Sequence, residues 1–380
     1  MIISSLDCGT LGIPFKQRFT HASASRAATQ SLLVRAQSDG GCVGFGEGCP
    51  REYVTSESPQ TATRFVEAHR MEWVAALHDI ATIGDWQMAH RPQIDQNPAA
   101  WAAAELALID LCGRVEGRSA ESLLGLAPVQ GKFRYTAVLG DMSLREFEMQ
   151  LAQYRSMGFQ EFKIKLSGEL LRDTEKLRVL TRAGVPPQKV RADANNLWGD
   201  WRKALHHLLA LEYPFFAVEE PLQSGDYAGM RHLALALATR MILDESLKRV
   251  DQLGCLDGSD VRWIANVRVS KMGGLLRSLE FIEAARRRGL GIIVGAHVGE
   301  TSVLTRAAMT VAAQAADSLL GQEGAFGTHL LSSDLVEHPI MFGRGGVLDV
   351  ASSDLGSRPG FGLAVIEPVL HLQTAQARAV

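Results

Sequence analysis

The chain has 380 residues, a formal net charge of −3 and 46% hydrophobic residues. This balance gives no reason to expect a nucleic acid or a membrane as a partner, and no apolar run is long enough to span a bilayer. Met1–Asp7 lacks the basic start and long apolar core of a signal peptide. The scattered cysteines form no CxxC pair, which favours reduced thiols in the cytoplasm over a disulfide framework or a zinc site.

Residues 1–125 do not show repeated strand and helix units. Residues 31–35 and 42–45 flank Asp39-Gly-Gly and predict a hairpin. Residues 61–77 have helical spacing of their apolar side chains. Asn97-Pro98 then begins an Ala-rich helix that runs to Gly113. We therefore predict a small α+β domain over residues 1–125.

From about residue 133 the pattern changes to alternating strands and helices. Strands are expected at 133–139, 161–166, 189–192, 215–218, 241–243, 262–270, 291–296 and, least clearly, 318–323. Intervening helices are expected at 144–157, 169–182, 273–288 and 301–315. This order predicts a (β/α) barrel over residues 126–344, and the turn-rich tail, about 345–380, returns to pack on the first domain.

Three carboxylates stand where three consecutive barrel strands end. Asp193, Glu219 and Asp244 recur about every 25 residues, the length of one strand and its returning helix. The carboxyl ends of parallel strands converge on one face, so these groups should meet and need a cation between them. Oxygen ligands of this kind suit Mg²⁺ better than zinc. The alternative is that each acid caps the helix that follows it.

Lys163 and Lys165 alternate along the second strand and should share one face of it. Because lysine is seldom buried unpaired, two inward lysines indicate carboxylates or substrate nearby. Beside Mg²⁺ and a second ammonium the pKa of a lysine falls, so it can act as a base near neutral pH. The alternative is a pair of solvated lysines.

The expected sixth, seventh and eighth strands each carry a residue that could take part in binding or catalysis. Arg268, with Ser270 on the same face of the expected sixth strand, could hold a substrate carboxylate or form a structural ion pair. His297 ends the seventh strand and is a candidate acid or base. Glu323 ends the eighth strand, where substrate binding and helix capping compete as roles.

Two loops of the first domain hold polar residues in glycine- or proline-marked contexts. One runs from Phe19 through His21 to Arg26, and the other from Glu47 through Arg51 to Tyr53. Composition alone favours solvated surface loops for both.

Together these motifs resemble the enolase superfamily, and most closely its muconate lactonizing enzyme and dipeptide epimerase branch. The resemblance covers nearly the whole chain. Its motifs are Lys-x-Lys at 163–165, Asp-Ala-Asn-x-x-Trp at 193–198, Glu-Glu-Pro at 219–221, Asp-Glu-Ser at 244–246, Gly-Gly at 273–274 and Gly-Phe-Gly-Glu at 44–47.

The resemblance implies an α+β capping domain over a modified TIM (β/α) barrel. It implies one Mg²⁺ on the three carboxylates and Lys165 as the base that removes the proton α to a substrate carboxylate. It also implies that the loops around His21, Arg26, Arg51 and Tyr53 close over the substrate and set specificity.

Two positions depart from the branch pattern. Arg268 stands where a second catalytic lysine is usual, and Lys271, three residues later, is expected on the other strand face and is not taken as its replacement. The mandelate racemase branch pairs a seventh-strand histidine with a sixth-strand aspartate, and this chain has His297 but not the aspartate. Gln322-Glu-Gly also replaces the Asp-x-Asp with which dipeptide epimerases hold a substrate ammonium.

We therefore expect a Mg²⁺-dependent enzyme that forms an enediolate from a small carboxylic acid. Lys165 would take the α-proton, Lys163 would keep Lys165 deprotonated, His297 would supply a proton and Arg268 would stabilise charge. Dehydration of a hydroxy acid is placed slightly ahead of racemisation or epimerisation. The alternatives are a cycloisomerase or a non-catalytic sensor that binds Mg²⁺ and an acid. A homo-oligomer is also expected.

Overall fold

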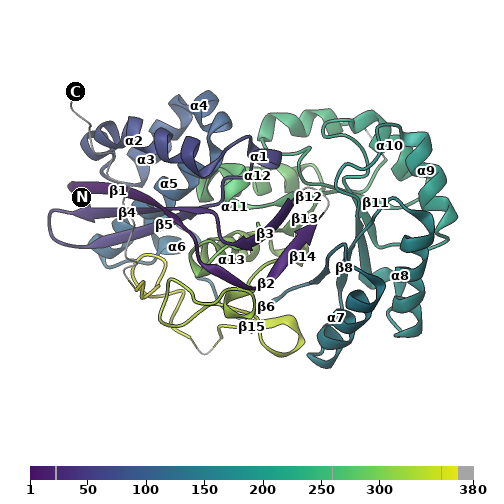
Figure 1. The fold of residues 1–380 in the computed structure, drawn as a ribbon. Helices are drawn as coiled ribbons and strands as arrows, with labels where there is room; N and C mark the ends of the chain where they lie inside the picture. Colours follow the sequence, from purple (N-terminus) through teal and green to yellow (C-terminus); the bar gives the residue numbers. More distant parts are fainter. Residues whose placement is uncertain (22–23, 259, 352, 367–380) are drawn as a thin grey trace, which may run out of the picture.

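The computed structural model describes residues 1–21, 24–258, 260–351 and 353–366 and has two parts (Figure 1). An α+β domain formed by the first 125 residues or so lies beside a curled parallel sheet that is surrounded by helices. The side chains of residues 17–21 and 24–25 lie outside the described set.

The N-terminal domain is an antiparallel sheet of order β1-β4-β5 covered by helices. A separate hairpin, β2 with β3, extends toward the barrel between the two parts (Figure 1). The strands are β1 Ile3–Leu11, β2 Pro14–His21, β3 Ala24–Ala28, β4 Ser31–Ser38 and β5 Val43–Gly48. The helices are α1 Glu52–Thr55, α2 Pro59–Ala76, α3 Ile80–Ala89, α4 Arg91–Gln96, α5 Pro98–Glu116 and α6 Ala120–Leu123.

Strand β5 lies directly against helix α5 because every second residue of the strand is glycine. A Cβ atom at Gly44, Gly46 or Gly48 would collide with the backbone of α5. Glycine is the residue that permits so close an approach. The contact matters for the site, since it fixes the position of Glu47 at the end of β5, where the strand faces the barrel.

The barrel strands form one eight-stranded parallel sheet in chain order, from β7 to β14. The sheet closes where Thr136 donates its N–H to the carbonyl of Gln322, at 2.8 Å. These strands are β7 Ala137–Leu139, β8 Phe162–Lys165, β9 Val190–Asp193, β10 Ala217–Glu219, β11 Arg240–Leu243, β12 Trp263–Val267, β13 Gly291–Val294 and β14 Leu319–Gln322. The predicted fold class, a modified barrel with an α+β domain, is confirmed.

Helices return the chain along the outside of the sheet, as Figure 1 shows for α7 to α10. They are α7 Leu144–Ser156, α8 Leu170–Arg182, α9 Trp201–Ala210, α10 Tyr227–Ala236, α11 Val269–Met272, α12 Leu275–Arg287 and α13 Ser302–Ala315. Short 3-10 turns are η1 Pro187–Lys189, η2 Val250–Leu256, η3 Ala316–Ser318, η4 Gly327–His329 and η5 Arg344–Gly346. Within residues 323–342 the only helical turn is η4, so no α-helix follows β14 there.

Two expected strands are shorter than the sequence pattern indicated. The strand expected at 133–139 is two strands, because β6 (Lys132–Arg134) pairs with β15 (Val347–Asp349) of the tail while β7 enters the barrel. The strand expected at 262–270 ends at Val267, and the one-turn helix α11 follows.

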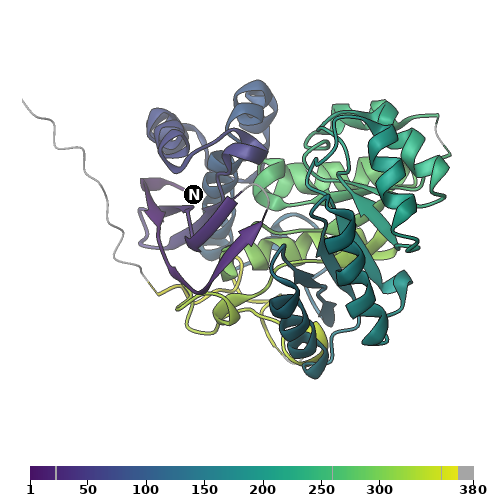
Figure 2. The same ribbon diagram turned by 45° about the vertical axis from the view of Figure 1, so that its right-hand side comes forward.

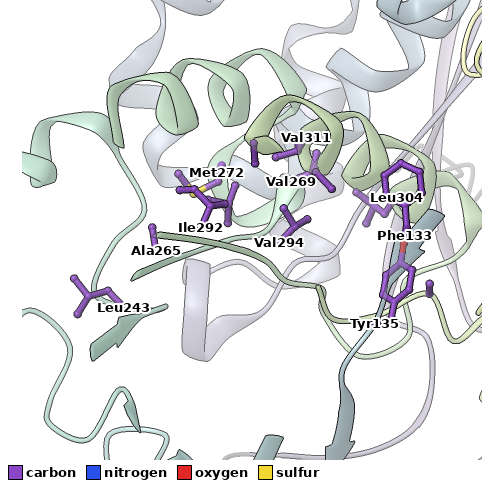
Figure 3. Packing of buried hydrophobic residues seen from close by; sticks show 14 of the residues in the cluster. Phe133, Tyr135, Leu243, Ala265, Val269, Met272, Ile292, Val294, Leu304 and Val311 are labelled. Carbon is purple, nitrogen blue, oxygen red and sulfur yellow. The ribbon is translucent and has the colours of Figure 1, made fainter. Parts of the chain in front are cut away.

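The core lies between the strands and the helices that cover them. Figure 3 shows Ala265 of β12 and Ile292 of β13 with Val269 and Met272 of α11 and Val311 of α13. All five side chains are buried and belong to one cluster. This packing holds the ends of β12 and β13, where Arg268 and His297 follow.

The last described residues, 347–351 and 353–366, pass beneath the N-terminal domain and the barrel (Figure 2). Gly360 accepts the N–H of Ala120 at 2.8 Å, and Phe361 donates its N–H to Asp110 of α5 at 2.8 Å. The tail therefore joins the barrel to the N-terminal domain. Within the described ranges, no helix combines the length and apolar character needed to cross a bilayer.

Candidate active site

Lys163 is the centre of a buried charge network at the carboxyl ends of the strands. Its ammonium nitrogen lies 3.0 Å from Asp193 Oδ2, 2.9 Å from Glu219 Oε1 and 3.1 Å from Glu323 Oε2. Burial alone would lower the pKa of Lys163, but these three carboxylates raise it above its ordinary value. Lys163 is therefore a fixed positive charge that holds the carboxylates together.

Lys165 reaches the same place from the same face of β8. Its nitrogen lies 2.5 Å from Asp193 Oδ2 and 2.8 Å from Asn195 Oδ1. Both lysines line the cavity described below, but 12% of the Lys165 side chain is accessible against 2% for Lys163. Asn195 was not among the residues predicted from the sequence, although it belongs to the Asp-Ala-Asn motif quoted there.

The three predicted metal ligands end neighbouring strands in register. Asp193 pairs with Lys165 on one side and with Glu219 on the other, and Asp244 follows β11 directly. Burial would raise the pKa of Asp193, but Lys163 and Lys165 hold it well below its ordinary value. Burial and the charge of Asp193 raise the pKa of Glu219. These opposite shifts follow from one shared network.

Asp244 is held by two cations. Arg268 makes an ion pair with its Oδ2, and Lys271 lies 2.9 Å from its Oδ1. Lys271 also donates to the carbonyls of Asp244 at 2.7 Å and of Asn266 at 2.6 Å. Burial, with help from Arg268, lowers the pKa of Lys271 to about 7.

The expected placement of Ser270 and Lys271 on opposite strand faces is wrong. The strand ends at Val267, so both residues lie on helix α11 and the alternation of a strand does not apply to them. Helix α11 turns Lys271 toward Asp244, and the Ser270 hydroxyl accepts the N–H of Cys49 at 2.7 Å. Arg268, at the junction, is the residue that points into the cavity.

His297 lies in the loop after β13 and is fully enclosed. Neither ring nitrogen has a hydrogen-bond partner within the described part of the chain. Burial, followed by the charges of Arg268 and Arg51, lowers its pKa well below the ordinary value. His297 is therefore neutral at physiological pH and can accept a proton.

Glu300 lies beside His297, and sequence reasoning did not single it out. Its Oε1 accepts the backbone N–H of His297 at 2.6 Å and lies 3.4 Å from His297 Nδ1. Burial raises the pKa of Glu300 to about 8. Glu300 is thus protonated at neutral pH, and no sequence signal marked it except its place three residues after the strand-end histidine.

The N-terminal domain holds the loop that carries these two residues. Glu47 Oε2 accepts the N–H of Thr301 at 3.0 Å and its hydroxyl at 2.7 Å. Arg51 is buried and donates to the carbonyl of Val298 at 2.9 Å. Glu47 and Arg51 therefore fix His297 from the other domain.

The remaining predicted binding residues are placed as follows. Tyr53 lines the cavity, and Arg26 interacts with it and donates to the Gln30 side chain. Glu323 contacts Lys163, and its Oε1 lies 3.1 Å from Arg191. The backbone of His21 belongs to β2, while its side chain lies outside the described set.

One cavity of about 240 Å³ unites these groups. Lys165, Arg268, His297, Glu300 and Glu323 line its inner end. Pockets for larger ligands run from about 300 to 1,000 Å³, so this space suits a small acid.

In the structure, cationic side chains engage the three strand-end carboxylates. Within the described residues, no group of three or more His, Cys, Asp or Glu side chains lies as a metal would require. The cause is visible in the ion pairs, because Lys163 bridges Asp193 and Glu219 while Arg268 and Lys271 occupy both oxygens of Asp244.

Buried oxygens without partners nevertheless favour a cation. Glu219 Oε2 and Glu245 Oε2 are buried and have no hydrogen bond to any described residue. A buried, unsatisfied carboxylate oxygen is costly. Hard oxygen donors at neighbouring strand ends are the ligands that Mg²⁺ prefers. The donor set therefore fits Mg²⁺, provided that Asp244 is released from Arg268.

The two parts of the chain match two family descriptions. Residues 12–125 match "Mandelate racemase / muconate lactonizing enzyme, N-terminal domain", and residues 146–369 match "Enolase C-terminal domain-like". The chain belongs to the enolase superfamily. Its mandelate racemase and muconate lactonizing enzyme family is the one predicted from the sequence motifs, so the predictions of family and of an enzyme of this superfamily are confirmed.

Individual relatives cover nearly the whole chain. The L-Lys-D/L-Arg epimerase of Methylococcus capsulatus is 26% identical over 96% of this chain and 99% of its own. A dipeptide epimerase from Methylococcus capsulatus, solved in complex with Mg and the dipeptide L-Arg-D-Lys, has a TM-score of 0.80 at 25% identity and covers 96% of this chain and 100% of its own. The Mg in that complex agrees with the Mg²⁺ predicted here.

A cycloisomerase structure is also similar to this chain. The 2-chloromuconate cycloisomerase of Rhodococcus opacus has a TM-score of 0.83 at 23% identity and covers 97% of this chain and 98% of its own. At that identity the likeness concerns the fold alone.

Proposed function

We propose that this protein is a Mg²⁺-dependent racemase or epimerase that inverts the carbon α to a carboxylate. The observation that carries the proposal is that Lys165 and His297 line one cavity. Lys165 ends β8, and His297 follows β13, so the two groups approach the cavity from different strands of the barrel. Inversion needs this arrangement, since one group removes the proton on one side and the other returns it on the opposite side.

Mg²⁺, held by Asp193, Glu219 and Asp244, would supply positive charge beside the substrate carboxylate. The proton chemistry falls to the chain's own residues. The ammonium of Lys163, which its three carboxylate partners keep charged, lies close enough to Lys165 for both to contact Asp193 Oδ2. The reaction needs a neutral amine as its base, and Lys165 is the lysine that lies at the edge of the cavity in which the substrate would bind.

The proton then moves between carbon and the two bases. When Lys165 takes it, the electron pair of the C–H bond passes to the carboxylate group as the enediolate forms. His297 is neutral, so on the opposite side it serves as the base for the other enantiomer. In the forward direction it would donate a proton to carbon and take one from the carboxyl group of Glu300, whose Oε1 lies 3.4 Å from His297 Nδ1. Arg268, with its permanent charge, would clamp a substrate carboxylate.

The relatives support this assignment. The Methylococcus capsulatus protein is an epimerase and aligns over almost the full length of both chains. The substrate remains a small carboxylic acid by class. A homo-oligomer, a cytoplasmic location, and domain boundaries near residues 125 and 345 remain predictions, as do the alternatives of a cycloisomerase or a non-catalytic sensor.

The experiment follows deuterium at Cα in D₂O with Mg²⁺ over a library of small chiral acids. The wild type should exchange and interconvert both enantiomers of its substrate. His297→Asn should continue to exchange one enantiomer without inverting it, because Lys165 alone remains. His206→Asn, at an exposed position of α9, is the matched control and should behave as the wild type. Inversion that survives in His297→Asn would contradict the proposal.

Dehydration is the second candidate, and Glu300 is the observation that favours it. Glu300 is protonated at neutral pH, lines the cavity and lies next to His297. A proton held there could pass through His297 to a departing β-hydroxyl group. Release of an oxo acid in the same assay, with no inverted product, would favour dehydration over racemisation.

A further inference from the structure

The cavity at Lys165 continues past the catalytic groups to a second, mainly apolar end. Its walls there come from helix α7 and from residues 324–342, which follow β14. A barrel unit normally places a helix after its strand. Because residues 323–342 form no α-helix in the structure, the space beside α7 is left open.

Helix α7 presents one face to this space. Gln150, Gln153 and Tyr154 of α7 line the cavity with Met157, which caps the helix, and their spacing of three and four residues places them on the same side. Phe326 and Phe342, from the segment after β14, line the same cavity. The two walls differ from the inner end of the cavity, where most of the lining groups are charged.

The aromatic wall is already formed without a ligand. Phe342 packs edge to face on Phe159, with ring centroids 5.1 Å apart, and on Phe326 at 5.3 Å. The ring of His329 stacks on Phe342 at 4.7 Å, and its Nε2 lies 2.8 Å from the carbonyl of Phe342. A wall held by such contacts needs no reordering to receive an apolar group, which lowers the cost of binding.

The same segment is attached to the N-terminal domain. Leu330 accepts the N–H of Lys16 at 2.8 Å, and Leu331 forms a bridge with Phe15 of β2. Strand β2 of the N-terminal domain therefore holds the segment that forms this wall of the space.

One polar atom in this space lacks a partner. Gln150 Oε1 is buried and accepts no hydrogen bond from any described residue. Leaving a buried acceptor unpaired is unfavourable, so a ligand that offers an N–H or O–H here gains affinity. A ligand covered with hydroxyl groups would leave most of them against the aromatic wall, which costs more than it gains.

We propose that the space between α7 and residues 324–342 is a substrate subsite for an elongated, mainly apolar substituent of the acid, with one N–H or O–H donor along it. The inference rests on the proposed function, because the acid group is placed at Lys165. It narrows the substrate class from small acids in general to acids with an apolar extension, and it excludes polyhydroxylated sugar acids.

The test measures binding to the full chain with Mg²⁺ by calorimetry. The probes are the straight-chain 2-hydroxy acids from the butanoic to the decanoic homologue, with gluconate for comparison. Each methylene that enters the apolar space should tighten binding about fourfold until the space is full. Gluconate should bind more weakly than the hexanoic homologue. The subsite would be overturned if the affinity for the 2-hydroxy acids did not change with their length, or if none of them bound.

A substitution series then locates the effect. Met157→Trp should fill part of the space. The affinity should then stop increasing at a shorter 2-hydroxy acid than it does for the wild type. Met149→Trp, on the same helix but 56% exposed, is the matched control and should follow the wild type. If the affinities of the two variants depend on the length of the 2-hydroxy acid in the same way, the subsite proposal is also overturned.

Deuterium exchange on the same probes separates this inference from the proposed function. If long homologues bind tightly but none exchanges its α-proton, the proposed function fails and the subsite stands. If acids exchange at rates independent of their length and bind equally well, the proposed function stands and the subsite fails.

Discussion

Arg268 forms an ion pair with Asp244 Oδ2, so a residue at the position of a usual second lysine binds a predicted metal ligand. The pair is buried, with the Asp244 side chain only 1% exposed. Lys271 occupies the other oxygen of Asp244. Binding of a cation to Asp244 must therefore compete with two positive side chains.

This competition predicts the effect of Arg268→Met. Removal of the guanidinium frees one oxygen of Asp244, and hydrogen bonds to charged groups contribute about 1.5–3 kcal/mol. Mg²⁺ should therefore bind roughly tenfold or more tightly in the absence of substrate. The substrate carboxylate should bind more weakly, because its clamp is lost. Calorimetric titration with Mg²⁺ measures the first effect.

Arg202→Met provides the control for that titration, since Arg202 is exposed on α9 and carries the same charge. It should leave the affinity for Mg²⁺ unchanged. If Arg268→Met binds Mg²⁺ no more tightly than Arg202→Met does, Arg268 does not compete for the site.

Glu300 should impose a pH dependence on stability. Burial raises its pKa to about 8 in the folded chain, above the ordinary value near 4.5. The folded state therefore binds the proton more tightly than the unfolded state, and the free energy of unfolding should fall as pH rises from about 4.5 to 8. Arg268 and Arg51 oppose this rise, whereas the neighbouring Glu47, whose own pKa burial raises to about 7, adds to it.

Glu300→Gln removes this titration. The free energy of unfolding of the variant, relative to the wild type, should increase with pH by at most about 1.4 kcal/mol per pH unit, mostly below pH 8. Chemical denaturation at several pH values measures it. A constant difference between the two proteins across this range would show that Glu300 does not titrate there.

The alternating glycines of β5 predict a contrast between two similar substitutions. Gly46→Ala forces a Cβ into the backbone oxygen of Ala103 and should destabilise the protein by about 1–3 kcal/mol. Gly84→Ala, within α3, meets no atom within 4 Å and should stabilise it by about 0.5–1 kcal/mol. Denaturant unfolding compares the two. Equal stabilities would mean that β5 can move away from α5.

Much of the site could be predicted because it follows the strand period. Asp193 and Glu219 end short apolar runs of the sequence, and in the structure they pair in register on adjacent strands. Lys163 and Lys165 share a face because strand alternation holds throughout β8. Local patterns are sufficient for residues of this kind.

Other parts depend on contacts that no local pattern contains. The run that ends at Ser270 reads as a strand, but the chain turns into α11, and Gly273 and Gly274, with φ of 81° and 105°, end that turn. Lys271 therefore reaches Asp244. Glu300 is a buried acid in a loop that the N-terminal domain holds through the hydrogen bond between Glu47 and Thr301.

Lys165 is the residue proposed to remove the α-proton of the substrate. The most direct test is the rate of α-deuterium exchange in D₂O with Mg²⁺, compared between the wild type and Lys165→Ala, with Mg²⁺ binding and thermal unfolding measured on both. Exchange from the enantiomer that Lys165 serves should fall by about 10²–10⁴-fold while the folded chain still binds Mg²⁺. Exchange of both enantiomers at the wild-type rate in Lys165→Ala would contradict the claim.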